Sequence, residues 1–212
     1  MDNDDEYGLI ILGNSGAGKS FLANILIGSN VFVHEFSADS VTHVTEYQET
    51  IIGYYTLSVF NIPGLIEADQ TRIDLNKREI DKAFAQRPNS IVMFVFGQTG
   101  GRLKDEDIVA FKAINEAYPF KPESLVLAIN DLPKDRPPKY EGTTIVRLQQ
   151  LLENVPINVR NICFLDHINQ KDAQARQHLK EKLLQVNYKI CSYKLRGSLL
   201  FLGNSRVASG NT

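Results

Sequence analysis

The stretch Gly13-Asn14-Ser15-Gly16-Ala17-Gly18-Lys19-Ser20 matches the phosphate-loop pattern GxxxxGK[ST] at every fixed position. It follows the apolar run Leu9–Leu12, which predicts a buried strand, and it precedes Phe21–Leu26, whose apolar residues recur at helical spacing. Between a strand and a helix, backbone N–H groups and the positive end of the helix dipole point toward one anion. The stretch therefore predicts a site for nucleotide phosphates rather than a glycine-rich turn that merely tolerates a lysine.

The fixed positions of this loop have separate expected roles. Gly16 and Gly18 permit backbone conformations and close approaches that a Cβ would obstruct. Lys19 is placed to reach the β- and γ-phosphates, and the Ser20 hydroxyl is placed to ligate Mg²⁺. The residues expected to bind the phosphates are Gly13, Asn14, Ser15, Gly16, Ala17, Gly18, Lys19, Ser20 and Phe21.

The composition fits one globular domain in a reducing compartment. The chain has 212 residues, of which 43% are hydrophobic and 23% charged, and its net charge of −2 lacks the basic excess of nucleic-acid-binding proteins. Its two cysteines, Cys163 and Cys191, provide neither a disulfide framework nor a zinc cluster. The apolar run at 91–96 is far too short to cross a bilayer, and the acidic residues 1–6 are unlike a presequence. We therefore expect a cytoplasmic protein that binds no nucleic acid.

Strand-like and helix-like segments alternate along the chain. Strands are expected at 9–12, 44–52, 55–61, 91–96, 125–129 and 162–165, and helices at 19–27, 74–87, 105–118, 143–152 and 172–186. Residues 132–142 are expected to form an exposed loop, and the residues from 197 onward do not continue a clear helix. The alternation predicts a three-layer α/β fold, whose mostly parallel sheet gains one antiparallel strand from the 44–61 hairpin. Ligands should bind at the carboxyl ends of the strands.

Two further motifs bear on which nucleotide the loop binds. Asn61-Ile62-Pro63-Gly64 lies where guanine-nucleotide switches have DxxG, so Gly64 fits the glycine that meets the γ-phosphate and Asn61 replaces the acid. Asn130-Asp131-Leu132 follows a predicted strand, as the guanine-reading [NT]KxD element does. Asp131 stands at the position of the carboxylate that accepts two hydrogen bonds from guanine, whereas Ala128 and Ile129 replace the Asn/Thr and Lys.

With these motifs, the sequence resembles the immunity-associated GTPase family (IMAP- or GIMAP-like, septin-related P-loop GTPases) from about Tyr7 to Val186. The most specific matches are the phosphate loop, residues 24–28 after it, 40–42 in the first switch and 62–65 in the second. The run Gly101–Asp107 looks like the family's own box, and Phe164–His167 is similar to the strand end before its last base-contacting loop, without the expected asparagines.

The resemblance implies a P-loop G domain over 7–190, between an acidic tail at 1–6 and a C-terminal extension at 191–212. It implies GTP or GDP with Mg²⁺ as ligands, slow or absent intrinsic hydrolysis, and homodimers or oligomers formed through the G-domain face, often near membranes. By position, Thr42 would join Ser20 on Mg²⁺, with Thr45 as its competitor, although either could simply flank a strand. The residues implied to contact the base are Asn130, Asp131, Asp166 and His167.

Hydrolysis is less clearly encoded than binding. Leu65 stands where Ras-like enzymes have the glutamine that orients the attacking water, which leaves Gln70, Gln98 and His43 as candidates. Arg102 lies in a loop near the ligand edge, where it could stabilise the transferring phosphoryl group across a dimer, or instead pair with Asp105 or Glu106. The candidate catalytic set is Lys19, Thr42, Gly64 and Arg102.

The leading hypothesis is a guanine-nucleotide-binding switch that hydrolyses GTP slowly and self-associates. The alternatives are a nucleotide-dependent assembly scaffold without useful hydrolysis, and an ATP-using kinase built on the same loop. Because Asn61 removes a negative charge near Mg²⁺, we expect weakened Mg²⁺-dependent binding. Residues 170–196 carry seven Lys or Arg against two acids, which fits either a solvated helix face or a membrane or partner surface.

Overall fold

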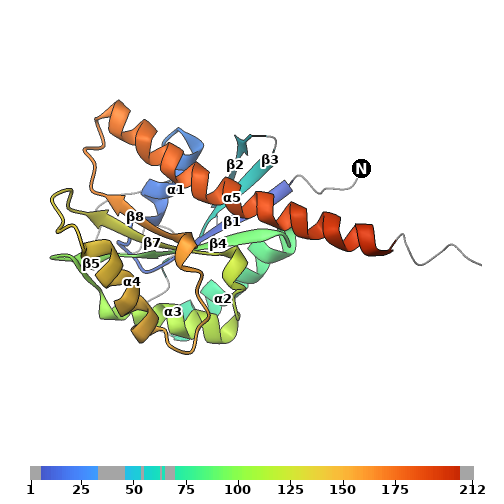
Figure 1. The fold of residues 1–212 in the computed structure, drawn as a ribbon, viewed down its shortest axis with the longest axis horizontal. Helices are drawn as coiled ribbons and strands as arrows, with labels where there is room; N and C mark the ends of the chain where they lie inside the picture. The colour runs from blue at the N-terminus through green and yellow to red at the C-terminus, as the bar shows by residue number, and fades with distance from the viewer. Residues whose placement is uncertain (1–5, 33–45, 54, 63, 65–69, 206–212) are drawn as a thin grey trace, which may run out of the picture.

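The computed structural model describes residues 6–32, 46–53, 55–62, 64 and 70–205. Its strands form a six-stranded sheet in the order β2-β3-β1-β4-β7-β8 (Figure 1). The strands are β1 (Glu6–Leu12), β2 (Glu46–Ile52), β3 (Tyr55–Asn61), β4 (Ser90–Phe96), β7 (Leu125–Leu132) and β8 (Ile162–Asp166). β2 pairs antiparallel with β3, and the other neighbours are parallel. The predicted mixed α/β sheet is confirmed.

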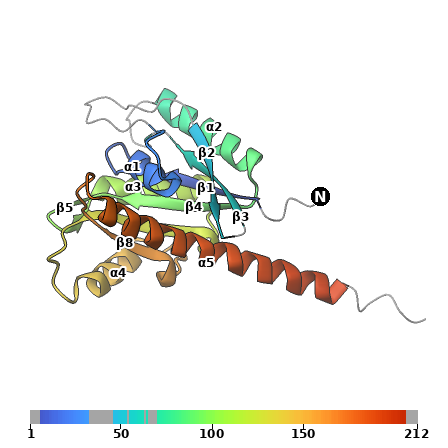
Figure 2. The same ribbon diagram turned by 90° about the horizontal axis from the view of Figure 1, so that it is seen from above.

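Helices cover both faces of this sheet. They are α1 (Lys19–Ile27), α2 (Gln70–Gln86), α3 (Asp105–Ala117), α4 (Tyr140–Leu151) and α5 (Ala173–Ser205). α1 and α5 pack on one face, and α2, α3 and α4 pack on the other (Figures 1 and 2). Because both faces are covered, every residue of β4 is buried, which explains its continuous apolar sequence.

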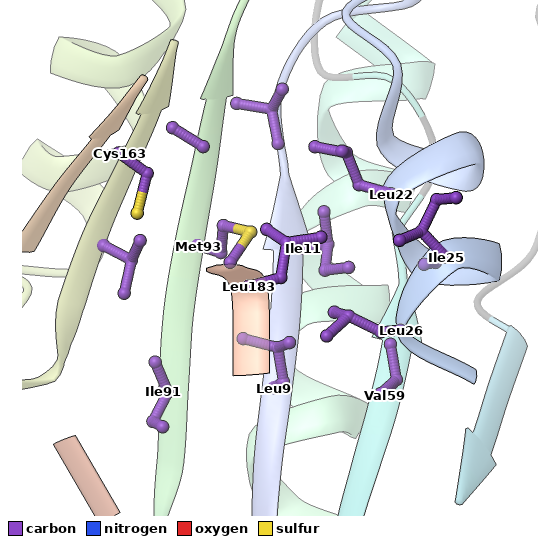
Figure 3. Packing of buried hydrophobic residues seen from close by; sticks show 14 of the residues in the cluster. Leu9, Ile11, Leu22, Ile25, Leu26, Val59, Ile91, Met93, Cys163 and Leu183 are labelled. Atoms are coloured by element: carbon purple, nitrogen blue, oxygen red, sulfur yellow. The ribbon is translucent and has the colours of Figure 1, made fainter. Parts of the chain in front are cut away.

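Alternate residues of β1 enter different halves of the core. Leu9 and Ile11 pack beneath α1 and α5, whereas Ile10 and Leu12 face the opposite layer. Figure 3 shows the first half, in which Leu22 of α1 and Leu183 of α5 lie over the sheet residues. The alternation follows from the two-residue period of a strand. β1 is thereby held rigidly under the loop that follows it.

The helix α5 is longer than the sequence analysis predicted. The expectation that the helix stops before residue 197 is wrong, because α5 continues to Ser205. Gly197 costs only about 1 kcal/mol in a helix interior, and no proline follows to end the helix. One face of α5 is buried as far as Ile190, and the helix then runs past the sheet (Figure 2). Among the described residues, no helix combines the length and the apolar character needed to cross a membrane.

Other differences lie close to the candidate site. β7 extends beyond Ile129 to the buried Leu132, through a register shift against β8, so part of the expected 132–142 loop belongs to the sheet. α4 takes the other end of that loop, since it begins at Tyr140. A short hairpin of β5 (Gln98–Thr99) and β6 (Arg102–Leu103), which the sequence analysis did not predict, lies between β4 and α3.

Candidate nucleotide-binding site

The phosphate loop connects the carboxyl end of β1 to the first turn of α1, as predicted. Gly18 precedes the helix with φ 95°, and a Cβ there would overlap the side-chain nitrogen of Asn130. Only glycine meets both requirements without strain. The sequence therefore has glycine here because the helix start and the end of β7 meet at this position.

Lys19 is the buried cation of this loop. Its side chain is 8% exposed, and its Nζ donates a hydrogen bond of 3.0 Å to the backbone oxygen of Asn14. Burial lowers the pKa of Lys19 to about 8, while the nearby Asp107 carboxylate opposes that shift. A phosphate beside the ammonium group would favour its charged form further. The loop thus holds a cation whose solvation is poor and whose natural partner is an anion.

Ser20 meets the residue that replaces the switch acid. The Asn61 side chain donates from Nδ2 to Ser20 Oγ at 3.0 Å, and Asn61 is fully buried. Among the described residues, Asn61 Oδ1 has no hydrogen-bond partner. A hydroxyl and a neutral amide oxygen are acceptable but weak ligands for a hard cation such as Mg²⁺. The predicted second ligand, Thr42, lies outside the described residues, as do Thr45, His43 and Leu65.

Gly64 lies against the phosphate loop. A Cβ on Gly64 would come within 2.8 Å of the backbone nitrogen of Ser15. The structure thus brings Gly64 and the phosphate loop together, although they are far apart in the sequence. Gln70 opens α2, and its side chain lies outside the described residues.

Asn130 contacts the phosphate loop. Its Nδ2 donates a 3.0 Å hydrogen bond to the backbone oxygen of Ala17, and the residue is 6% exposed. The sequence analysis expected Asn130 beside the base, but its amide instead ties the end of β7 to the phosphate loop. Ala128 and Ile129, which replace the polar residues of the motif, are buried within β7.

The carboxylate of Asp131 is presented to solvent at the strand end. Asp131 has φ 63°, the only positive φ of a non-glycine residue in the described part of the chain, and its side chain is 63% exposed. Its Oδ1 lies 2.6 Å from Nδ1 of His167, which is equally exposed. The structure therefore brings together Asp131 and His167, two of the predicted base contacts. Another of these four residues, Asp166, has its carboxylate engaged by the guanidinium of Arg136.

Two residues outside the predicted set of binding and catalytic residues support these loops, Asp107 and Gln98. Asp107, in the first turn of α3, is 1% exposed, and its carboxylate accepts hydrogen bonds from Asn14 Nδ2 and from the Gly97 N–H. Burial raises the pKa of Asp107, and these hydrogen bonds counteract part of that shift. Gln98 was considered as a residue that orients water, but its side-chain amide is used in contacts to Asp131 and Gly101. An acid in the first helical turn after a strand was the one sequence signal for Asp107.

Arg102 is an exposed residue of β6. Within the part of the chain that the structure describes, no carboxylate lies within ion-pair distance of it, so the alternative of a salt bridge to Asp105 or Glu106 is not observed. The guanidinium is therefore available for contacts outside its own domain.

The strand order, the phosphate loop and its flanking helix define the fold of P-loop GTPases. Solved structures agree: Toc33 from Arabidopsis thaliana with GDP and Mg²⁺ matches with a TM-score of 0.58 and 18% identity, over 86% of this chain and 84% of that one. An Era variant from Aquifex aeolicus bound to GDP and AlF₄⁻ matches with a TM-score of 0.56 and 18% identity, over 85% and 56% of the two chains. Such low identities show the fold alone.

The family follows from the sequence. The pattern of the AIG1 family matches residues 7–192, so this chain belongs to the AIG1 family. The mouse protein GTPase IMAP family member 8 is 27% identical over 112 residues, which are 52% of this chain and 16% of that protein. The matched region is thus a small part of that relative's length. The family resemblance drawn from the motifs is confirmed.

Proposed function

We propose that the protein is a guanine-nucleotide-binding switch that binds GTP and GDP with Mg²⁺ and hydrolyses GTP slowly. The observation that carries the proposal is the buried ammonium group of Lys19 inside a loop of phosphate-binding geometry. An exposed carboxylate near the end of β7, Asp131, supplies the acceptor that guanine requires for its N1–H and 2-amino donors. The family, and neighbours whose structures hold GDP and Mg²⁺, support the same ligand.

The proposed metal site uses Ser20 and Thr42, with Asn61 beside Ser20. Because Asn61 contributes a dipole where such switches have a full negative charge, Mg²⁺ should add less to nucleotide affinity than it does with an acid. Gly64 is proposed to sense the γ-phosphate, since it already lies against the loop at Ser15. The base would be read by Asp131, with His167 and Asp166 beside it.

We further propose that hydrolysis depends on self-association through Arg102. The exposed guanidinium has no ion partner among the described residues, and an arginine supplied to the site of a partner accelerates such reactions by about 10³- to 10⁵-fold. Among the structural neighbours, Toc33 has an arginine variant that is dimerisation-deficient. Dimerisation is described as important for the GTPase activity of Toc33 and Toc159.

The nucleotide is tested by titrating fluorescent GDP, with ATP and GTP as competitors. We expect GTP, not ATP, to displace the probe. Displacement by ATP alone would favour the kinase alternative. Retention of neither nucleotide at any Mg²⁺ concentration would refute the proposed function.

A separate experiment distinguishes the switch from a scaffold without useful hydrolysis. Single-turnover hydrolysis is measured at rising protein concentration for the wild type and for Arg102→Ala, with Lys112→Ala as an exposed control from α3. The proposal expects turnover to accelerate with concentration in the wild type and the control but not in Arg102→Ala. A flat, slow rate in all three proteins would favour the scaffold.

The basic residues at the start of α5 support a second candidate function, which is contact with a membrane or a partner protein. Lys171, Arg176 and Lys180 line a hollow of about 440 Å³ between the end of α1 and the start of α5, and no acidic residue lines that hollow. This arrangement is compatible with membrane or partner contact. Flotation of the protein with anionic vesicles would measure membrane contact.

A further inference from the structure

Residues 97–107, which we call the box segment, join two parts of the candidate site that are far apart in sequence. The segment leaves β4 at Gly97, forms the β5–β6 hairpin and ends in the first turn of α3 at Asp107. One end contacts the phosphate loop, and the other contacts the strand end that carries Asp131. Neither contact is needed to build the hairpin or to start the helix.

The first contact is made by the carboxylate of Asp107. One oxygen accepts a hydrogen bond from Asn14 Nδ2, and the other accepts one from the Gly97 N–H at 2.6 Å. The same residue, Asn14, supplies the backbone oxygen that binds Lys19 Nζ. A carboxylate that is 1% exposed requires such partners, since an unpaired buried charge is costly. Asp107 therefore fixes the backbone next to Lys19.

Helix capping does not account for Asp107. Acids in a first turn favour the helix dipole, but the exposed residues Asp105 and Glu106 already supply that charge. Asp107 instead points away from its own helix and binds Asn14, which lies 93 residues earlier. The contact serves the phosphate loop rather than α3.

The second contact is made by Gln98. Its Nε2 donates to the backbone oxygen of Asp131 at 2.6 Å, while its Oε1 accepts from the Gly101 N–H at 2.7 Å. The Tyr140 hydroxyl donates to Gly101 O at 2.7 Å and holds the hairpin from the other side. Asp131 needs such support, because a φ of 63° is unfavourable for a residue with a Cβ. Gln98 therefore holds the backbone of the residue whose carboxylate is proposed to read the base.

We propose that the box segment is a two-ended brace, in which Asp107 positions the phosphate loop and Gln98 positions the Asp131 carboxylate. Affinity for the phosphates and selectivity for guanine then depend on different residues of one segment. The identity of the ligand rests on the proposed function, whereas the brace itself rests on the four hydrogen bonds that the Asp107 and Gln98 side chains make. Both residues are positioning residues, because each is proposed to act through another residue, Asn14 or Asp131.

The variants Asp107→Asn and Gln98→Glu each break one end of the brace. The Asp107→Asn variant loses the negative charge of the carboxylate. Its side-chain amide then turns an N–H₂ group toward one of the two donors, Asn14 Nδ2 or the Gly97 N–H. The Gln98→Glu variant keeps an oxygen that accepts the hydrogen bond from the Gly101 N–H. Its other carboxylate oxygen replaces the donor that binds the Asp131 carbonyl, so two acceptors face each other there. The matched controls are Glu106→Gln and Thr99→Ala, whose side chains are exposed neighbours in the same segment.

The readout is a pair of affinity ratios. The GDP/GMP ratio reports the second phosphate, and the GDP/IDP ratio reports the 2-amino group that the carboxylate binds. We expect Asp107→Asn to reduce the GDP/GMP ratio about tenfold with the GDP/IDP ratio unchanged, and Gln98→Glu to reduce the GDP/IDP ratio about fivefold with the GDP/GMP ratio unchanged. A merely structural role would lower both ratios together, and that outcome, or two unchanged ratios, would overturn the brace.

Amide hydrogen exchange without nucleotide separates this proposal from the proposed function. Faster exchange confined to residues 13–18 in Asp107→Asn and to residues 130–132 in Gln98→Glu supports the brace. If the two variants exchange their amide hydrogens at the same rates as the controls, the brace is overturned, whether or not the protein binds a nucleotide. If the wild type binds no guanine nucleotide, the proposed function fails while the exchange pattern still decides the brace. Gln98 is only half-buried, so its variant provides this test even if Asp107→Asn does not fold.

Discussion

The two ends of the candidate site differ in how they are built. At the phosphate end, Lys19 and Asn14 are buried and the loop matches its motif at every fixed position. At the base end, Asp131 and His167 are mostly exposed, and the motif matches only in part. In the proposed function, phosphate is bound mainly by backbone amides of one short loop, whereas the base is read by side chains from several strand ends. Local sequence therefore defines the first end, and tertiary packing defines the second.

Removal of the buried cation is the strongest test of this difference. Lys19→Met approximates the length of the side chain but loses its charge, and we expect affinity for GDP to fall by about 100-fold or more, because Lys19 is the one basic residue in the sequence of the loop, 13–20. Isothermal titration measures the change. Lys112→Met is the exposed control. Wild-type affinity in Lys19→Met would show that the phosphate end is not the binding centre.

At the base end, Asp131→Asn should change selectivity instead of abolishing binding. The amide replaces one acceptor by a donor, so we expect GDP to bind about 30-fold more weakly and xanthosine diphosphate, whose 2-oxo group accepts that donor, to bind better. Competition between the two nucleotides measures the shift. Asp135→Asn, an exposed residue of the following loop, is the control. An unchanged preference would remove Asp131 from the base site.

The Asn61→Asp variant tests the proposed metal site through the effect of Mg²⁺ on GTP affinity. The carboxylate restores a negative charge beside Ser20, and we expect the ratio of GTP affinities with and without Mg²⁺ to rise about tenfold. Asn89→Asp adds the same charge at an exposed position and should leave the ratio unchanged. The idea fails if Mg²⁺ has the same effect on the wild type and on Asn61→Asp.

The smallest expected effect is a pH dependence that belongs to the phosphate end alone. Because burial lowers the pKa of Lys19 to about 8, the free protein loses the required ammonium charge as the pH rises through that value. GDP affinity should therefore fall about fourfold between pH 7 and 8.5. Lys19→Met, measured over the same range, subtracts any contribution from ionisation of the guanine. Parallel profiles for the two proteins would contradict this assignment.

The same depressed pKa has a consequence for folding. Above pH 8, the unfolded chain binds more protons at Lys19 than the folded chain does. The contribution of Lys19 to the free energy of unfolding therefore increases as the pH rises toward 10.5. Other groups also titrate in this range. The contribution of Lys19 is therefore the difference between the wild type and Lys19→Met in chemical denaturation at each pH.

Several elements could be predicted because their causes are local. The end of α1 at Gly28 follows from a glycine with φ 88°, which satisfies the last turn through a bond from its N–H to Asn24 O. The buried strands β4 and β7 follow from continuous apolar runs. The full extent of α5 could not be predicted, because Gly197 resembles a stop signal, yet the helix continues through it to Ser205.

The sequence by itself determined the phosphate loop, the alternation of strands and helices and the family, because each depends on residues that are close together in the chain. Tertiary structure alone decided that Asn130 binds Ala17, that Asp107 binds Asn14 and that Gln98 holds Asp131. These pairs lie 113, 93 and 33 residues apart. No local pattern encodes such contacts, since they exist only after the parallel strands have brought their carboxyl ends to one edge of the sheet.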